Sequence, residues 1–112
     1  MVSDSVDMKE SELQNEIMNA LTVHPMVVWA YVTTSGTVRG RHGGRYFNAG
    51  FPGLPDTIGQ LKDGKILGIE VKTPGNKPTP IQNEQLTLML VNNGAAGWCD
   101  SVQGALDIVE GT

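Results

Sequence analysis

The segment from Leu54 to Lys72 limits the possible folds of this chain more than any other. It predicts two strands, Leu54–Leu61 and Ile66–Lys72, joined near Asp63 and Gly64, a residue pair typical of hairpin turns. Alternation puts Leu54, Ile58 and Ile66 on one face of this hairpin and Leu61, Leu67, Ile69 and Val71 on the other. Since both faces carry apolar residues, helices must cover the sheet on both sides, which predicts an α/β sandwich.

A helix is predicted before the hairpin, over residues 8–22, with Asp7 as its N-cap. Its apolar residues at helical spacing are Leu13, Ile17, Ala20 and Leu21. His24 and Pro25 should end this helix, because a histidine suits the negative end of the helix dipole and proline cannot continue the helix.

The remaining elements follow the hairpin. Thr79 as cap and Pro80 at the first position predict a helix that runs to about Asn92. A strand over Ala95–Asp100 and a short helix over Val102–Val109 complete the chain. A chain of 112 residues without a domain linker predicts one domain over residues 1–112.

Between the first helix and the hairpin, two segments differ sharply in composition. Met26–Thr33 is rich in β-branched and aromatic residues, which predicts a buried strand. Ser35–Gly53 is glycine-rich and has no apolar period, which predicts a long loop of the kind that usually serves function. The resulting order of helices and strands predicts a small mixed sheet flanked by helices.

The loop of the hairpin decides which residues lie opposite each other. A two-residue loop of Asp63 and Gly64 would place Asp56 opposite Val71, so that Asp56 points away from Glu70. A three-residue loop that begins one residue earlier, with Gly64 in the left-handed conformation, would place Asp56 opposite Glu70. We predict the second register.

In that register Asp56, Glu70 and Lys72 share one face of a strand pair that otherwise belongs to the core. Two opposed carboxylates repel each other unless a cation lies between them. Mg²⁺ prefers oxygen ligands, so two carboxylates, a backbone carbonyl such as that of Val71, and water would hold it. With an ammonium group beside the cation, this combination predicts a centre that hydrolyses phosphodiesters.

Charge is distributed unevenly along the chain, whose net charge is −4. Seven of the eight basic residues but three of the twelve acidic ones lie between Arg39 and Lys77, so this segment carries +4 and the rest of the chain −8. A local cluster of positive charge suits phosphate binding, although solvated loop residues would produce the same pattern. The central third is therefore the candidate nucleic-acid face.

The stretch GFPGLPDTIGQLKDGKILGIEVKTPGNKPTPIQ, from Gly50 to Gln82, resembles the virus-type replication-repair nuclease (VRR-NUC) family of the PD-(D/E)xK nuclease superfamily. The shared pattern is Gly-x-Pro-Asp, a short hairpin, Glu-Val-Lys, a proline and glycine loop, and a helix carrying glutamine. The resemblance implies a restriction-endonuclease-like αβββαβ core.

The same resemblance implies roles for individual residues. It makes Asp56 and Glu70 metal ligands and Lys72 the catalytic lysine, and it adds Gln82 and the first-helix carboxylate Glu10 to the active site. It also implies a DNA endonuclease that uses Mg²⁺ or Mn²⁺ and selects branched, flapped or Holliday-junction DNA. The residues expected to contact the DNA backbone are Arg39, Arg41, His42, Arg45 and Lys77.

Short relatives of this kind resemble phage proteins that act in replication, recombination or repair, and some of them work as homodimers. With the single cysteine Cys99, no intrachain disulfide can form, and no apolar run is long enough to span a membrane. We expect a homodimer without membrane segments in the cytoplasm of a bacterial host.

Several of these residues have a second interpretation. Gln82 and Glu10 can each complete a capping box, and Glu16 rivals Glu10 as the carboxylate that reaches the metal. His42 is more often a solvated loop histidine than a contact to phosphate. For the whole chain, the alternatives are a module that binds branched nucleic acid without cutting it, and a structural protein in which Glu70 and Lys72 form an ordinary ion pair.

The two tryptophans, Trp29 and Trp98, lie within predicted strands. Aromatic side chains in such positions are more often part of the core than platforms for stacking bases. We therefore expect both to be buried.

Overall fold

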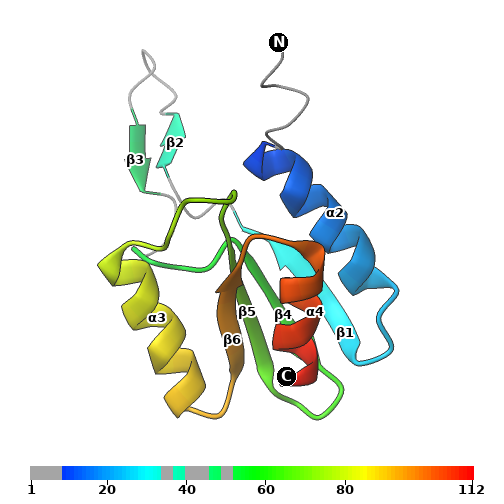
Figure 1. Cartoon of the computed structure of the whole chain (residues 1–112). Coiled ribbons are helices and arrows are strands. Elements are labelled where there is room, and N and C mark those ends of the chain that lie inside the picture. Colours follow the sequence, from blue (N-terminus) through cyan, green and yellow to red (C-terminus); the bar gives the residue numbers. More distant parts are fainter. Residues whose placement is uncertain (1–8, 34–36, 40–45, 49–51) are drawn as a thin grey trace.

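The computed structural model of this protein describes residues 9–33, 37–39, 46–48 and 52–112. In chain order its helices and strands are α2 (Glu10–Thr22), β1 (Val27–Val32), β2 (Thr37–Arg39), β3 (Tyr46–Asn48), β4 (Thr57–Leu61), β5 (Ile66–Val71), α3 (Pro80–Val91), β6 (Ala95–Cys99) and α4 (Val102–Glu110). Four strands form one sheet in the order β1-β4-β5-β6, in which only the β5–β6 pair is parallel (Figure 1).

Helices cover both faces of this sheet. Helices α2 and α4 pack on one face around a core of leucine, isoleucine and valine side chains, and α3 packs on the other face over β5 and β6. Two glycines on the neighbouring strands β5 and β6 face opposite layers of helices. Gly68 lies against Met89 of α3, and Gly97 lies against Ile108 of α4. The predicted α/β sandwich is confirmed, and it is compatible with a restriction-endonuclease-like core.

Helix α2 buries Leu13, Ile17 and Leu21, as the spacing predicts. Its start differs from the prediction, because the N-cap is Lys9, whose backbone N–H donates to Glu12 Oε1 at 3.1 Å. Asp7 lies outside the described residues and is not the N-cap. The carboxylate of the cap belongs to Glu12, which leaves Glu10 without a capping role.

The hairpin has the predicted three-residue loop. Thr57 pairs with Ile69 and Gln60 with Ile66. One residue beyond Thr57 and Ile69, this register sets Asp56 opposite Glu70. At the turn, Leu61 N–H donates to the carbonyl of Lys65, and the loop ends with Gly64 at φ 95°, a conformation that costs glycine little.

Helices α3 and α4 begin at side chains that cap them. The Thr79 hydroxyl accepts from Gln82 N–H at 3.3 Å, and the Ser101 hydroxyl accepts from Gly104 N–H at 3.0 Å. Helix α3 ends just before Asn93, whose φ is 73°. The elements predicted after the hairpin are confirmed. None of the helices in the described ranges is long and apolar enough to cross a membrane.

Strand β1 is present as predicted, but it is not buried. It lies at the edge of the sheet, where Val28, Trp29 and Tyr31 are exposed. Its sequence, VVWAYV, is apolar at every position, so composition could not distinguish a central strand from an edge strand. The expectation that Trp29 and Trp98 are core residues is wrong, because both are exposed. They lie on β1 and β6, the two edge strands of the sheet.

The segment Ser35–Gly53 was expected to be a loop without regular structure, and this is wrong in part. It contains the antiparallel pair β2–β3, in which Thr37 pairs with Asn48 and Arg39 with Tyr46. Valine, tyrosine and phenylalanine favour strands, and each of these strands is only three residues long, too short for a period to be visible in the sequence.

Candidate active site

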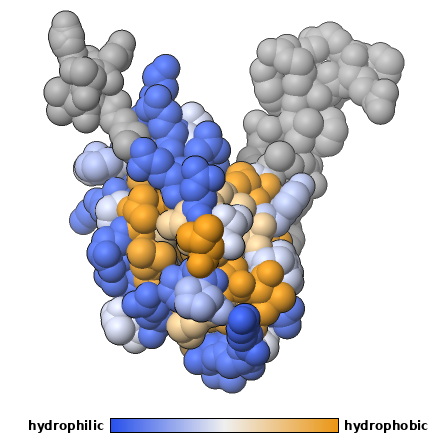
Figure 2. Space-filling model, turned by 90° about the vertical axis from the view of Figure 1, so that its right-hand side faces the viewer, coloured by the Kyte–Doolittle hydropathy of each residue, from blue (hydrophilic) through white to orange (hydrophobic). Residues whose placement is uncertain are grey.

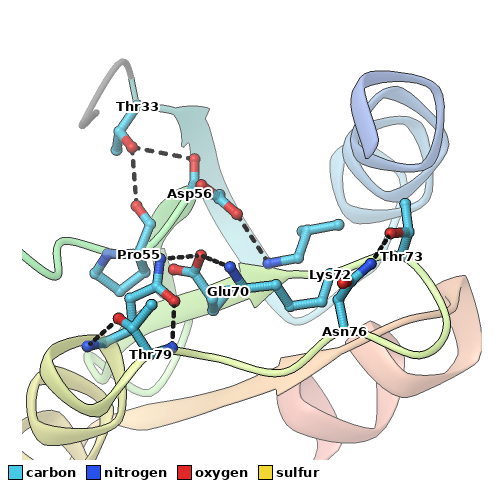
Figure 3. Close-up of polar contacts among 10 residues, drawn as sticks. Thr33, Pro55, Asp56, Glu70, Lys72, Thr73, Asn76 and Thr79 are labelled. Atoms are coloured by element: carbon cyan, nitrogen blue, oxygen red, sulfur yellow. Dashed lines mark hydrogen bonds and ion pairs between the residues drawn. The ribbon is translucent and has the colours of Figure 1, made fainter. Parts of the chain in front are cut away.

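Asp56 immediately precedes β4, and the end of β1 holds its backbone in place. Thr33 N–H donates to the Asp56 carbonyl at 2.8 Å, and the Thr33 hydroxyl donates to the carbonyl of Pro55 at 2.8 Å (Figure 3). These bonds anchor the chain on both sides of the Asp56 Cα. Thr33 was not singled out from the sequence, where a threonine that ends a strand carries no particular signal.

The side chain of Asp56 turns toward β5. Its Oδ2 accepts from the backbone N–H of Val71 at 3.0 Å. Since the N–H and C=O of one strand residue point to the same edge of the strand, the Val71 carbonyl also lies on the side of Asp56. The carboxylate and this carbonyl thus lie on the same edge of β5.

Glu70 is the most deeply buried charged residue that the structure describes, at 2% exposure. Its Oε2 accepts from Gln82 Nε2 at 3.0 Å and lies 3.7 Å from Lys72 Nζ (Figure 3). Its Oε1 is buried and has no hydrogen-bond partner among the described residues. A buried carboxylate oxygen without a partner is costly, unless a ligand completes the site.

The surroundings of Glu70 disfavour its charge. Burial raises the pKa of Glu70 to about 8, the negative charge of Asp56 adds to this effect, and Lys72 opposes it. Asp56 and Glu70 therefore behave as two carboxylates that compete for the same positive charge. This is expected for acidic side chains that lie opposite each other on neighbouring strands. One ammonium group does not compensate both.

Gln82 belongs to the helix cap and to the site at the same time. Its Oε1 accepts from Thr79 N–H at 2.8 Å, and its Nε2 donates to Glu70 Oε2. The two interpretations of this residue are therefore not exclusive. Because the cap uses the amide oxygen, the amide nitrogen is the atom left to face Glu70.

Glu10, the first residue of α2, lies within electrostatic reach of the site. Burial raises its pKa, the charge of Asp56 raises it further, and Lys72 lowers it. Over residues 9–33, 37–39, 46–48 and 52–112, no three side chains of the His, Cys, Asp or Glu type lie close enough to hold a metal together. Glu10 as a metal ligand stays a prediction. Glu16, which is exposed like Glu10, lies about 9 Å further along the helix.

Most of the residues expected to bind DNA are not placed by the structure. Arg41, His42 and Arg45 lie outside the described residues, and for Arg39 only the backbone, in β2, is described. Lys77 is exposed in the loop between β5 and α3. The loop is shaped by Asn76, whose Nδ2 donates to the Thr73 hydroxyl. The proposed contacts with DNA stay predictions.

Comparison with known proteins gives one partial match of interest. Over 38 residues, the chain is 45% identical to a protein of Acyrthosiphon pisum secondary endosymbiont phage 1 named "Putative nuclease p44". The match covers 34% of this chain and 41% of the phage protein, so it spans less than half of either. No known protein family matches the chain by its sequence profile, and no solved structure matches it.

Proposed function

We propose that this protein is a metal-dependent nuclease that hydrolyses phosphodiester bonds in DNA. The observation that carries the proposal is the unpartnered, buried Glu70 Oε1 beside Asp56, with the Lys72 ammonium on the other oxygen of the same carboxylate. The partial match to a phage protein named as a nuclease supports it. The resemblance of residues 50–82 to the VRR-NUC family points in the same direction.

The donor set fits a hard divalent cation, Mg²⁺ or Mn²⁺. Asp56 and Glu70 would hold it through carboxylate oxygens, with the Val71 carbonyl and water as further ligands. Such an ion would satisfy the Glu70 oxygen that has no partner among the described residues. Glu10 would add negative charge near the site, which is consistent with the influence of Asp56 and Lys72 on its pKa.

When bound, the cation supplies positive charge that polarises a phosphoryl oxygen and acidifies a water molecule. Lys72 keeps its ammonium beside Glu70, where it stabilises the negative charge that develops as the phosphodiester is attacked. Gln82 holds one oxygen of Glu70 by a hydrogen bond, which leaves the other oxygen free to bind a ligand.

For the substrate, we propose DNA with a branch, a flap or a Holliday junction, as met in phage replication, recombination or repair. The backbone of that DNA would contact Arg39, Arg41, His42, Arg45 and Lys77. Two symmetric incisions at a junction require two sites, so we propose a homodimer that acts in the bacterial host of a phage.

The test is cleavage of linear, flapped and four-way DNA by the purified chain in Mg²⁺, Mn²⁺ or EDTA. Cutting should require metal. Asp56→Ala and Lys72→Ala should each lower the cleavage rate by about 100-fold or more. The matched control Lys62→Ala, an exposed lysine in the hairpin loop, should cut normally. Binding of branched DNA without any cutting would indicate a nucleic-acid-binding module instead.

A further inference from the structure

The aromatic residues of this protein are absent from its described core. The buried cluster consists of aliphatic side chains and Cys99, although aromatic rings usually contribute strongly to cores. Three aromatic side chains are described, and all are exposed: Trp29 at 47%, Tyr31 at 59% and Trp98 at 39%. Each of these large rings therefore keeps much of its surface accessible to a ligand.

The three aromatic residues share the face of the sheet that carries the candidate active site. Trp29 pairs with Gln60 and Tyr31 with Ile58, while Trp98 is in register with Glu70. Paired residues point to the same side, and alternation places Ile58 and Gln60 on the side of Asp56. Helix α3 covers this face over β5 and β6, and in the described ranges no helix packs on β1 and β4 from this side.

Tyr31 and Trp29 form a row that leads away from the carboxylates. Ile58, the partner of Tyr31, is two residues from Asp56, which is about 7 Å along the strand, and the partner of Trp29 is about 14 Å away. Trp29 is also held in place, because its Nε1 donates to Gln60 Oε1 at 3.2 Å. Figure 2 views the molecule from the edge at which α2 and β1 lie in Figure 1, and apolar side chains reach the surface of this edge.

We propose that Trp29 and Tyr31 are a stacking platform for unpaired bases of the strand that enters the active site. Their separation of two residues is about 6.8 Å, twice the 3.4 Å rise between stacked bases, so one base fits between the two ring positions. Aromatic side chains on an open sheet face hold single strands in this way, with little sequence preference. Because it names the substrate of the same site, this inference rests on the proposed nuclease function.

The platform is tested by binding in EDTA, so that the result does not depend on cleavage. The probe is a fluorescent duplex with a five-nucleotide thymidine flap, compared with the same duplex whose flap lacks bases. Wild type should bind the base-bearing flap about fivefold to 100-fold more tightly than the abasic flap. Tyr31→Ala and Trp29→Ala should lose this preference, and Tyr31→Phe and Trp29→Phe should keep it.

Two controls separate stacking from other effects. The slope of affinity against salt should be the same in Tyr31→Ala and wild type, since no phosphate contact is lost. Leu88→Ala, which removes an exposed apolar side chain from α3, should leave the preference intact.

Equal affinity of wild type for both flaps would overturn the platform. A second result would also overturn it: the alanine variants sediment as monomers where wild type is a dimer, and each subunit keeps its preference for bases. The edge formed by β1 would then be an interface between two copies of the chain. A protein that cuts DNA without preferring bases would keep the proposed function and lose the platform. A protein that prefers the base-bearing flap but does not cut DNA would keep the platform and lose the proposed nuclease function.

Discussion

Replacing Glu70 by glutamine should remove much of the pH dependence of this protein's stability in the absence of metal. The pKa of Glu70 is raised by burial, and further by Asp56, from 4.5 to about 8. A raised pKa means that the folded state favours the protonated acid. The stabilisation is therefore complete below about pH 4.5 and is lost as the pH rises through about 8.

The size of the effect follows from the shift. At 1.36 kcal/mol per pKa unit, its upper limit is about 5 kcal/mol. The raised pKa of Glu70 already includes the attraction of the Lys72 ammonium, so the further reduction comes from water that enters as the site relaxes and favours the ionised form. We expect about 2 kcal/mol to remain, which for a chain of this length shifts Tm by roughly 8 °C.

Thermal unfolding in EDTA at several pH values between 5 and 9 measures this shift. Over that range wild type should lose roughly 8 °C more in Tm than Glu70→Gln, while Glu84→Gln, an exposed matched control on α3, should follow wild type. Adding Mg²⁺ at pH 8 should raise Tm for wild type far more than for Glu70→Gln. Parallel curves for wild type and Glu70→Gln in EDTA would refute the reasoning, because some other group would then carry the pH dependence.

Substitutions at three further positions test the fold and the cap. Thr79→Ala should cost about 1 kcal/mol in urea unfolding, because Gln82 N–H loses the hydroxyl that accepts from it, and Thr79→Ser should restore the stability. The cleavage rate should change little, since the Thr79 N–H that holds Gln82 Oε1 remains. Gly59→Ala should destabilise by about 3 kcal/mol or more in the same assay, because the new Cβ meets the backbone carbonyl of Trp29, which has no freedom to move. Gly64→Ala should cost about 1 kcal/mol and Gly64→Asn less, since φ is 95° in open space and asparagine tolerates the left-handed region; equal costs for the two would contradict the turn assignment.

The geometry of the hairpin could be predicted because two independent constraints agree. A glycine at position 64 suits a left-handed residue, and alternation from that turn fixes which residues share a face. Together they bring Asp56, Glu70 and Lys72 to one side before any coordinates are known. The pairing of Gln82 with Glu70 required the position of α3, so the sequence could supply only the capping pattern.

The exposure of β1 could not be predicted, for a physical reason. An edge strand and a central strand with apolar residues at every position have the same local sequence, and they differ only in what covers them. Whether a helix covers β1 depends on where α3 lies. Helix α3 packs over β5, where Met89 lies against Gly68, and these two residues are far apart in the sequence. The N-cap of α2 could not be predicted either. Asp7 and Lys9 both precede the helix, and the cap depends on which backbone N–H the Glu12 carboxylate reaches.

The charges around Glu70 connect these observations. Asp56, Glu70 and Glu10 bring three acidic groups toward one ammonium, that of Lys72, so the fully ionised cluster would carry a net charge of about −2 in a partly buried place. Burial, and after it the charge of Asp56, raise the carboxyl pKa values of Glu70 and Glu10, so protons relieve part of this charge in the protein alone. A divalent cation would relieve it completely and at the same time supply the Glu70 Oε1 partner that the described protein atoms do not provide. Proton and metal thus compete for the same oxygens, so a site that gains stability from acid should also gain it from Mg²⁺ at neutral pH.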